Sequence, residues 1–424
     1  MKLQKTIKIK IGKLSNNKNN LLDILIRKNT KAVNFCLNKA KKGKLITHNL
    51  VYKDLRELNL PATVIHGCRA KSVEILKSYK KRKGKKTFPV LKNSTVRFDN
   101  QIVKLRHTDN KLYPKFVSLL YKAGKNNWDK SCRIELPLII NSDYQGGIVQ
   151  QIGEEYKLGA TELVKKGDNY FIHISYSKEI NLPIPDKSFS PIGVDIGINN
   201  LAVSVAQSSV KFFNGERINW KNKFFRTQRH KLQQNLALQE IKRLRERQTR
   251  YNDFYLHNIA KDIVEQAKQE EKPVIVLEDL THIKDTAKVR KNQRAKHSDW
   301  VFRRLQRAIE YKANWDGITV VYINPYHSSQ TCSKCGELNK RNKHTYKCKS
   351  CGFECNSDYN AGRNIQQFFL AKCQEEQASI NNASNPLIQE PKAKSDIGVS
   401  NLNRMKEVAI PSTIKVSGIL ARVL

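Results

Sequence analysis

The first half of the chain changes its hydrophobic period twice. Residues 3–11 alternate between apolar and polar side chains, as a half-buried β-strand does. A helical period follows, and residues after about 95 return to short alternating segments separated by turn signals. These patterns predict an antiparallel sheet or small β-barrel formed by residues 1–20 and 88–185, interrupted by a helical insertion of residues 21–87.

The second half reads as a mixed α/β domain. Prolines cluster in residues 181–191, which marks a domain boundary. Strand and helix patterns then alternate over residues 192–206 (two strands joined at a glycine-containing turn), 226–269 (helical), 274–277 (strand), 300–315 (helix) and 318–323 (strand). This order predicts one mixed sheet covered by helices. Residues 374–424 are rich in Asn, Ser, Gln and Pro, and we expect a mostly disordered tail.

The net charge of the chain predicts a class of binding partner. The 424 residues include 78 Lys and Arg against 38 Asp and Glu, a formal net charge of +40. Such an excess attracts polyanions, and nucleic acid is favoured because binding releases counterions. A membrane surface is the alternative, but the basic residues are spread along the whole chain rather than gathered on one amphipathic helix.

The sequence also indicates the cellular compartment of the protein. Its first residues lack the apolar core of a signal peptide, and no segment has the ~20 apolar residues that span a bilayer. Nine cysteines, four of them in paired C-x-x-C knuckles, fit a reducing compartment. We therefore expect an intracellular, cytoplasmic protein without a membrane partner.

The cysteine knuckles are the strongest motif. Cys332, Cys335, Cys348 and Cys351 have the spacing C-x2-C-x12-C-x2-C. Four thiolates suit a closed tetrahedral Zn²⁺ site, which is structural rather than catalytic. Cys355 lies too close to Cys351 for a further knuckle, and we interpret it as a packing residue.

Three acidic positions are candidates for catalysis. Asp195 lies in an apolar strand, Glu278 ends another with Asp279 beside it, and Asp358 follows the second knuckle at the start of a helix. Each also has an ordinary interpretation: a turn aspartate, an acidic strand end and a helix N-cap. Because side chains alternate along a strand, only one of Glu278 and Asp279 faces a given side, and the pattern leaves open which.

Together the acids suggest a metal site. Three carboxylates from separate segments would converge on two divalent ions, which activate water and stabilise the leaving oxygen of a phosphodiester. Mg²⁺ suits a site with few carboxylates.

Several motifs resemble those of TnpB, the RNA-guided nucleases of bacterial insertion sequences, and of the related miniature type V CRISPR effectors. The resemblance is specific over residues 190–370 and includes His257 and the segment from Trp300 to Ala313. Its clearest motifs are Gly193-Val-Asp-Ile-Gly, Val276-Leu-Glu-Asp-Leu, Tyr326-His-Ser-Ser-Gln-Thr-Cys-Ser-Lys-Cys-Gly and Ser357-Asp-Tyr-Asn-Ala-Gly-Arg-Asn-Ile.

The resemblance implies roles for these residues. Asp195, Glu278 and Asp358 would be the acids of a RuvC-type nuclease with an RNase H-like fold, which selects Glu278 over Asp279. One departure is Gly362, where the family usually has Ala, and it would weaken the helix slightly.

The resemblance also implies an organisation of the chain. The RuvC-like domain would comprise residues 190–325 and 356–372, with the zinc ribbon in residues 326–355 and a lid at residues 281–298. The amino-terminal barrel and its helical insertion would be wedge and recognition parts that hold guide RNA and read a short motif beside the target.

The expected function is an RNA-guided DNA endonuclease. It would bind guide RNA and double-stranded target DNA, and cut displaced single strands with two Mg²⁺ ions. Two alternatives remain: a DNA strand-transferring transposase on an RNase H-like fold, and a non-catalytic zinc-ribbon protein that binds nucleic acid.

Overall fold

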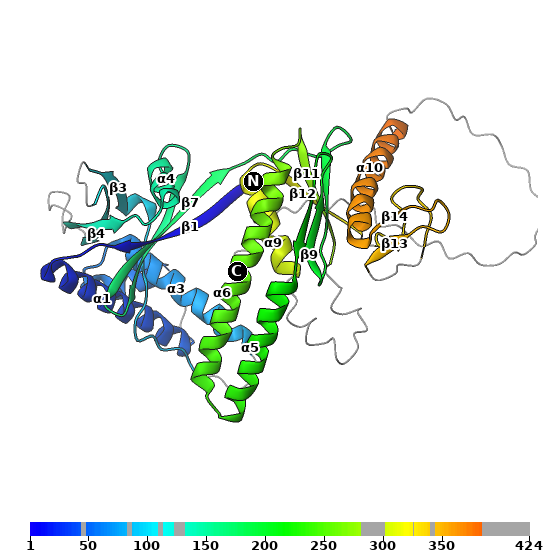
Figure 1. Cartoon of the computed structure of the whole chain (residues 1–424). Helices are drawn as coiled ribbons and strands as arrows, with labels where there is room; N and C mark the ends of the chain where they lie inside the picture. Colours follow the sequence, from blue (N-terminus) through cyan, green and yellow to red (C-terminus); the bar gives the residue numbers. More distant parts are fainter. Residues whose placement is uncertain are drawn as a thin grey trace, which may run out of the picture. The chain divides into compact units, whose positions relative to one another are not determined.

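The computed structural model forms two units, Met1–Glu179 and a second that begins at Ile180. The boundary lies beside the proline-rich residues 181–191. The expected lid and residues beyond 383 lie outside the described part of the chain. The structure describes residues 1–43, 48–82, 87–108, 113–122, 132–280, 302–324, 326–339 and 344–383 (Figure 1).

The first unit is built on a seven-stranded antiparallel sheet. Its strand order is β2-β6-β7-β1-β5-β4-β3. The strands are β1 (Lys2–Ile11), β2 (Val96–Phe98), β3 (Val103–His107), β4 (Lys115–Lys122), β5 (Cys132–Ile139), β6 (Lys157–Lys166) and β7 (Asn169–Glu179).

This sheet must curl strongly. Its two edge strands, β2 and β3, are consecutive along the chain, and Phe98 and Val103 are at most ~18 Å apart even in an extended chain. A flat seven-stranded sheet would separate its edges by ~29 Å. The short connection therefore draws the two edges together, giving a barrel-like shape.

Helices α1 (Asn16–Lys41), α2 (His48–Leu55) and α3 (Ala62–Lys81) form the insertion, which begins at residue 16 rather than at 21. Ser15 caps α1 by accepting a hydrogen bond from the backbone N–H of Lys18. A further helix, α4 (Asp143–Gln151), was not expected, because it is short and contains two glycines. Ser142 caps its first turn by accepting from the Gln145 N–H.

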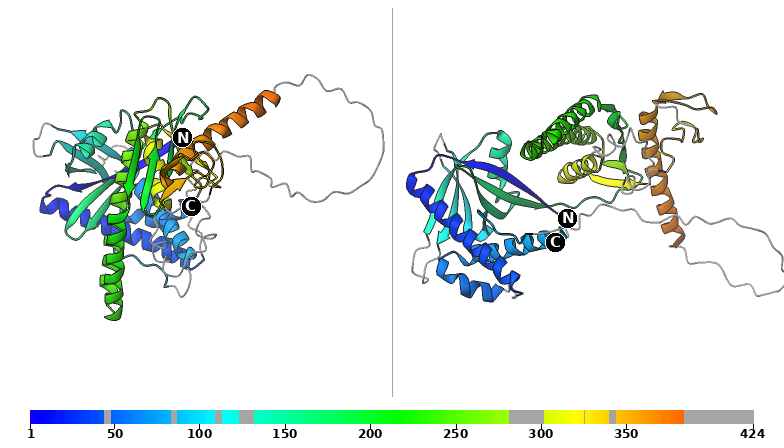
Figure 2. Two further views of the ribbon diagram at one scale, coloured as in Figure 1. Left: turned by 45° about the vertical axis from the view of Figure 1, so that its right-hand side comes forward. Right: turned by 90° about the horizontal axis from the view of Figure 1, so that it is seen from below.

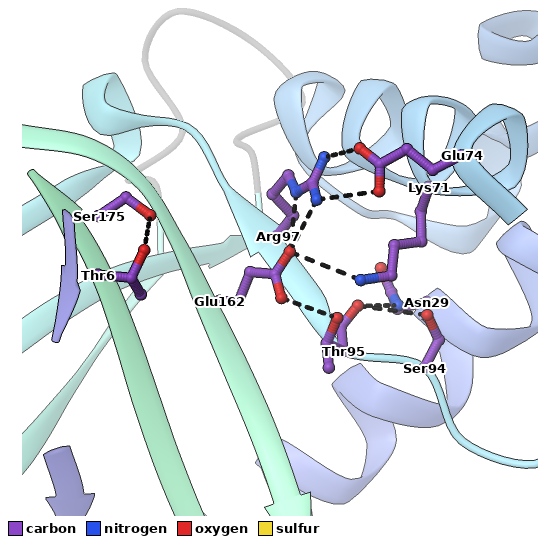
Figure 3. Close-up of polar contacts among 9 residues, drawn as sticks. All are labelled: Thr6, Asn29, Lys71, Glu74, Ser94, Thr95, Arg97, Glu162 and Ser175. Atoms are coloured by element: carbon purple, nitrogen blue, oxygen red, sulfur yellow. Dashed lines mark hydrogen bonds and ion pairs between the residues drawn. The ribbon is translucent and has the colours of Figure 1, made fainter. Parts of the chain in front are cut away.

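An ionic network joins the insertion to the sheet (Figure 3). Arg97 of β2 pairs with Glu162 of β6 at 2.9 Å and with Glu74 of α3 at 2.8 Å. Lys71 of α3 also approaches Glu162, at 3.6 Å, and the Thr95 hydroxyl donates to it at 3.2 Å. Lys71 and Arg97 lower the pKa of Glu162, outweighing the opposing effect of its burial.

The second unit has a five-stranded mixed sheet of order β10-β9-β8-β11-β12. Strands β8, β11 and β12 are parallel, whereas β8, β9 and β10 form antiparallel hairpins. Strand β10 was not expected from the sequence. The strands are β8 (Ser190–Asp195), β9 (Asn200–Val205), β10 (Val210–Asn214), β11 (Pro273–Glu278) and β12 (Thr319–Ile323).

Helices cover both faces of this sheet (Figure 2). On one face, α6 (Leu238–Ala267) and α9 (Phe302–Trp315) share a core with Ile192, Val194 and Leu277. On the other, α10 (Ser357–Ala383) packs on residues such as Val276 and Ile323.

Two helix boundaries differ from the sequence expectation. The long helical pattern of residues 226–269 is a hairpin, because α5 (Glu216–Gln234) ends before a turn in which Leu236 has a φ of 50°. Helix α10 continues to Ala383, into the region expected to be tail. No helix among the described residues has the length and hydropathy to cross a bilayer.

Candidate active site and cysteine cluster

Asp195 and Glu278 end two neighbouring parallel strands. The register pairs Val194 of β8 with Leu277 of β11, so the next residue of each strand lies at the same edge of the sheet. Paired positions in parallel strands point to the same face. Asp195 and Glu278 therefore share both an edge and a face.

That face is the one covered by α10. Val194 and Leu277 belong to the core with α6 and α9, so the residues that follow them point the other way. The same alternation turns Asp279 toward α9, where it lies 3.9 Å from the Arg303 guanidinium. This geometry distinguishes the two acids, which the sequence pattern did not.

Asp358 reaches the same region from α10. The helix approaches β8 at Gly193, where an added Cβ would lie 2.1 Å from the carbonyl oxygen of Gly362. Asp358 precedes Gly362 by about one turn. Its Oδ2 accepts a hydrogen bond of 2.9 Å from Nδ2 of Asn200, the first residue of β9.

Asp358 is not the N-cap of α10. The Asn356 side-chain oxygen accepts from the backbone N–H groups of Asp358 and Tyr359, at 2.9 and 3.2 Å. Asn356 therefore supplies the cap, and the Asp358 carboxylate accepts from Asn200 instead.

The three carboxylates do not form the ligand set of one ion. Among the described residues, the only group of three or more Cys, His or acidic ligand atoms within 4.8 Å of one another is the cysteine quartet. A site with two ions ~3.5–4 Å apart spreads its ligands more widely. Glu278 and Asp358 are 9% and 7% exposed, and such buried carboxylates require polar partners.

Three residues that support the carboxylates were not predicted from the sequence. Besides Asn200, these are Ser328, whose hydroxyl donates to Oε1 of Glu278, and Asn364 of α10, which donates to the Ser328 carbonyl at 2.7 Å. Asn364 lies in the last quoted motif and Ser328 just before the first knuckle, but only tertiary structure shows that they support Glu278.

The cysteine quartet has the geometry of a tetrahedral metal site. The sulfurs of Cys332 and Cys351 are 3.7 Å apart, and those of Cys335 and Cys348 are 3.6 Å apart. Four sulfurs at ~2.3 Å from Zn²⁺ in a tetrahedron are separated by about 3.7 Å, so the spacing fits zinc. A hydrogen bond from the Cys351 backbone lowers the pKa of the Cys348 thiol to about 6, whereas desolvation and hydrogen bonds with the other cysteines raise the pKa of Cys335 to about 12.

Strands β13 (Thr345–Lys347) and β14 (Glu354–Asn356) form the hairpin that carries the second knuckle. Cys355 is half-buried and packs against the quartet, as expected for a packing residue. Cys355 precedes the Asn356 cap directly, so the hairpin leads straight into α10.

Helix α10 also binds the first knuckle. Asn360 accepts from the Ser333 N–H at 3.0 Å and donates to the Thr331 carbonyl at 2.7 Å. Gln367 donates to the Ser333 carbonyl at 2.8 Å. The cysteine cluster and Asp358 are thus held by one helix.

Comparisons with known proteins identify the fold and the family of the chain. Residues 302–365 match the model of the "Cas12f1-like, TNB domain" family. The Cas12f1 chain in a cryo-EM complex with sgRNA and target DNA superposes with a TM-score of 0.60 at 16% identity, covering 86% of this chain and 99% of that one. The chain therefore has the fold of a miniature type V effector.

Two relatives show which family the chain belongs to. The "CRISPR-associated endodeoxyribonuclease Cas12f1" of Sulfoacidibacillus thermotolerans is 26% identical over 283 residues, which cover 62% of this chain and 65% of the relative. A TnpB-like protein of Methanocaldococcus jannaschii is 31% identical over 242 residues, which cover 54% of this chain and 84% of that protein. The chain belongs to the TnpB family, together with the miniature type V effectors.

Proposed function

We propose that this protein is an RNA-guided DNA endonuclease with one RuvC-type active site formed by Asp195, Glu278 and Asp358. The observation that carries the proposal is the shared register of β8 and β11. This register supports the proposal because Asp195 and Glu278 end neighbouring strands at one sheet edge, on the face that α10 covers.

Guide RNA and target DNA are the proposed partners. The net charge of +40 favours polyanions. One relative is named as a CRISPR-associated endodeoxyribonuclease, and the solved structural neighbour is a complex with sgRNA and target DNA. In this proposal the first unit provides the wedge and recognition parts, which hold guide RNA and read a short motif beside the target.

The donor atoms fit the proposed metals. Carboxylate oxygens are the ligands that Mg²⁺ prefers, so Asp195, Glu278 and Asp358 would hold two Mg²⁺ ions. Bound there, the ions would supply an activated water and charge stabilisation for phosphodiester hydrolysis. The four cysteines would hold one structural Zn²⁺.

The test compares two neighbouring acids. Protein copurified with its RNA is incubated with matched double-stranded DNA and Mg²⁺. We expect Asp195→Ala to abolish cleavage and keep RNA and DNA binding, because it removes a ligand and leaves the basic surface intact. Asp279→Ala is the matched control, since this acid faces α9, and it should still cut.

The same assay separates the alternatives. A transposase would join DNA ends and need no RNA, so joined products formed without RNA would refute the nuclease assignment. A binding module would show no Mg²⁺-dependent cutting by the wild-type protein. Normal cutting by Asp195→Ala would show that the active site lies elsewhere.

A further inference from the structure

Six aromatic rings form a continuous ladder across the hairpin of α5 and α6. Consecutive ring centroids lie 5.3–6.4 Å apart, and the outermost pair on α5, Trp220 and Phe224, is stacked with an interplanar angle of 16°. The ladder runs in the order Trp220, Phe224, Phe225, Tyr251, Tyr255 and Phe254.

Both ends of the ladder are open to solvent. Trp220 is 63% exposed, Phe254 64% and Phe224 40%, whereas Phe225 in the middle is buried. The buried ring anchors the ladder in the fold, whereas the outer rings are only partly buried. Exposed aromatic clusters of this kind mark binding surfaces.

The surroundings of the ladder are cationic. Between Arg217 and Tyr255 there are eleven Lys and Arg against three acidic residues, a net charge of +8 (11 − 3). Lys221 lies over the rings of Phe224, at 4.7 Å, and Trp220, at 5.7 Å. Rings flanked by cations fit a ligand that has flat bases and phosphates, whereas an apolar protein partner would leave these charges without counterions.

The hairpin starts beside the candidate active site. The Gly215 N–H donates to the Asn199 carbonyl at 2.6 Å, and Asn219 in the first turn of α5 donates to the Ile198 carbonyl at 2.8 Å. The next residue after that loop, Asn200, holds Asp358. Trp220 follows Asn219 directly, and Figure 1 shows the hairpin extending from this region beyond the sheet.

We propose that this aromatic ladder is a stacking surface for the bases of the single-stranded DNA segment that is cut. The inference rests on the proposed nuclease function, because the ladder begins at the edge that carries Asp195 and Glu278. Bases of any sequence would stack on Trp220, Phe224 and Phe254, while the cations of α5 neutralise the phosphates.

The test distinguishes the contribution of base stacking to DNA binding from the contribution of charge. RNA-loaded protein carrying Asp195→Ala binds, without added Mg²⁺, either an oligothymidine of about 16 nucleotides or an abasic strand of the same length and charge. In the Asp195→Ala background, adding both Trp220→Ala and Phe254→Ala should weaken oligothymidine binding at least about thirtyfold and leave abasic binding nearly unchanged. Leu236→Ala, at an 81% exposed position at the end of the same hairpin, is the matched control and should change neither.

Each other outcome refutes the proposal. Equal loss for both strands would mean that the ladder contributes only charge or structure, and no loss would mean that it does not bind DNA. Weaker RNA loading with unchanged oligothymidine binding would assign the ladder to guide RNA. A change in oligomeric state in light scattering would assign it to a second copy. Because the readout is binding, it remains valid even if the wild-type protein cuts no DNA.

Discussion

The close contact between Gly193 of β8 and Gly362 of α10 offers a sharp test of the candidate site. In Gly193→Ala the new Cβ would lie 2.1 Å from the Gly362 carbonyl oxygen and 3.0 Å from Cγ of Gln366. Real contacts of this kind do not fall below 3.0 Å. The obstacle is helix backbone, which cannot rotate aside as a side chain does, so α10 must retreat from the strand by about 1 Å.

The structure sets the size of the effect. Overpacking a rigid interior typically costs ~1–3 kcal/mol, and a backbone obstacle places this case near 3 kcal/mol. In a unit of this size, that corresponds to a fall in the melting temperature of about 6–12 °C. The retreat also moves Asp358 away from Asp195, and a ~1 Å displacement of a catalytic group can slow a reaction ~100-fold.

The assay combines thermal melting with cleavage of matched DNA at a temperature well below the melting transition. Gly147→Ala in α4 is the control, because its new Cβ would meet nothing within 4 Å outside its chain neighbours and the nearby backbone of its own helix, and it should be neutral or slightly stabilising. If Gly193→Ala melted and cut like the wild type, α10 would not be held against β8 as described. Asp358 would then not be held beside Asp195 by this contact.

Two further predictions concern the cysteine cluster and the first unit. Metal analysis should find about one Zn²⁺ per chain. Cys332→Ser should lower both the zinc content and the rate of DNA cleavage, whereas the control Cys355→Ser should lower neither. Full cleavage by zinc-free protein would refute the structural role of zinc. Glu162→Gln should destabilise the first unit by about 1–2 kcal/mol at pH 7, because Lys71 and Arg97 stabilise the ionised carboxylate. The pKa of Glu162 in the folded protein lies below its ordinary value of 4.5, so this stabilisation is present above that value and is lost as pH falls through the folded pKa. Urea unfolding of both proteins as a function of pH measures the difference, and a gap that widened in acid would contradict the ionic network.

Regular patterns in the sequence predicted the elements with strong periodicity. Alternation located β1, and the apolar run before Glu278 located β11. Both signals come from local burial, which a strand displays in its own sequence. The cysteine quartet was equally evident, because its ligands lie in two short knuckles and its spacing reflects local geometry.

Features that depend on tertiary contacts could not be predicted in this way. The sequence pattern could not choose between Glu278 and Asp279, because the choice depends on which helix covers which face. The short helix α4 and the turn at Leu236 were not predicted, because a helix cap and a residue with positive φ leave no periodic pattern of apolar residues in the sequence. Gly362 was interpreted as a slightly weaker helix residue, yet a Cβ there would lie 2.6 Å from Cγ2 of Val205, so packing explains the glycine.

Helix α10 connects the cysteine cluster to the proposed active site. Its first turn carries Asp358, and one turn later Gly362 touches β8. Asn364 of the same helix donates to the carbonyl of Ser328, whose hydroxyl donates to Glu278. Asn364 also donates to the Thr331 carbonyl beside the first knuckle. A loosened knuckle would therefore release two of the three carboxylates from their positions, although no cysteine touches either one. We infer that the ribbon acts by positioning α10, so its loss should lower the rate of cleavage more than the affinity for nucleic acid.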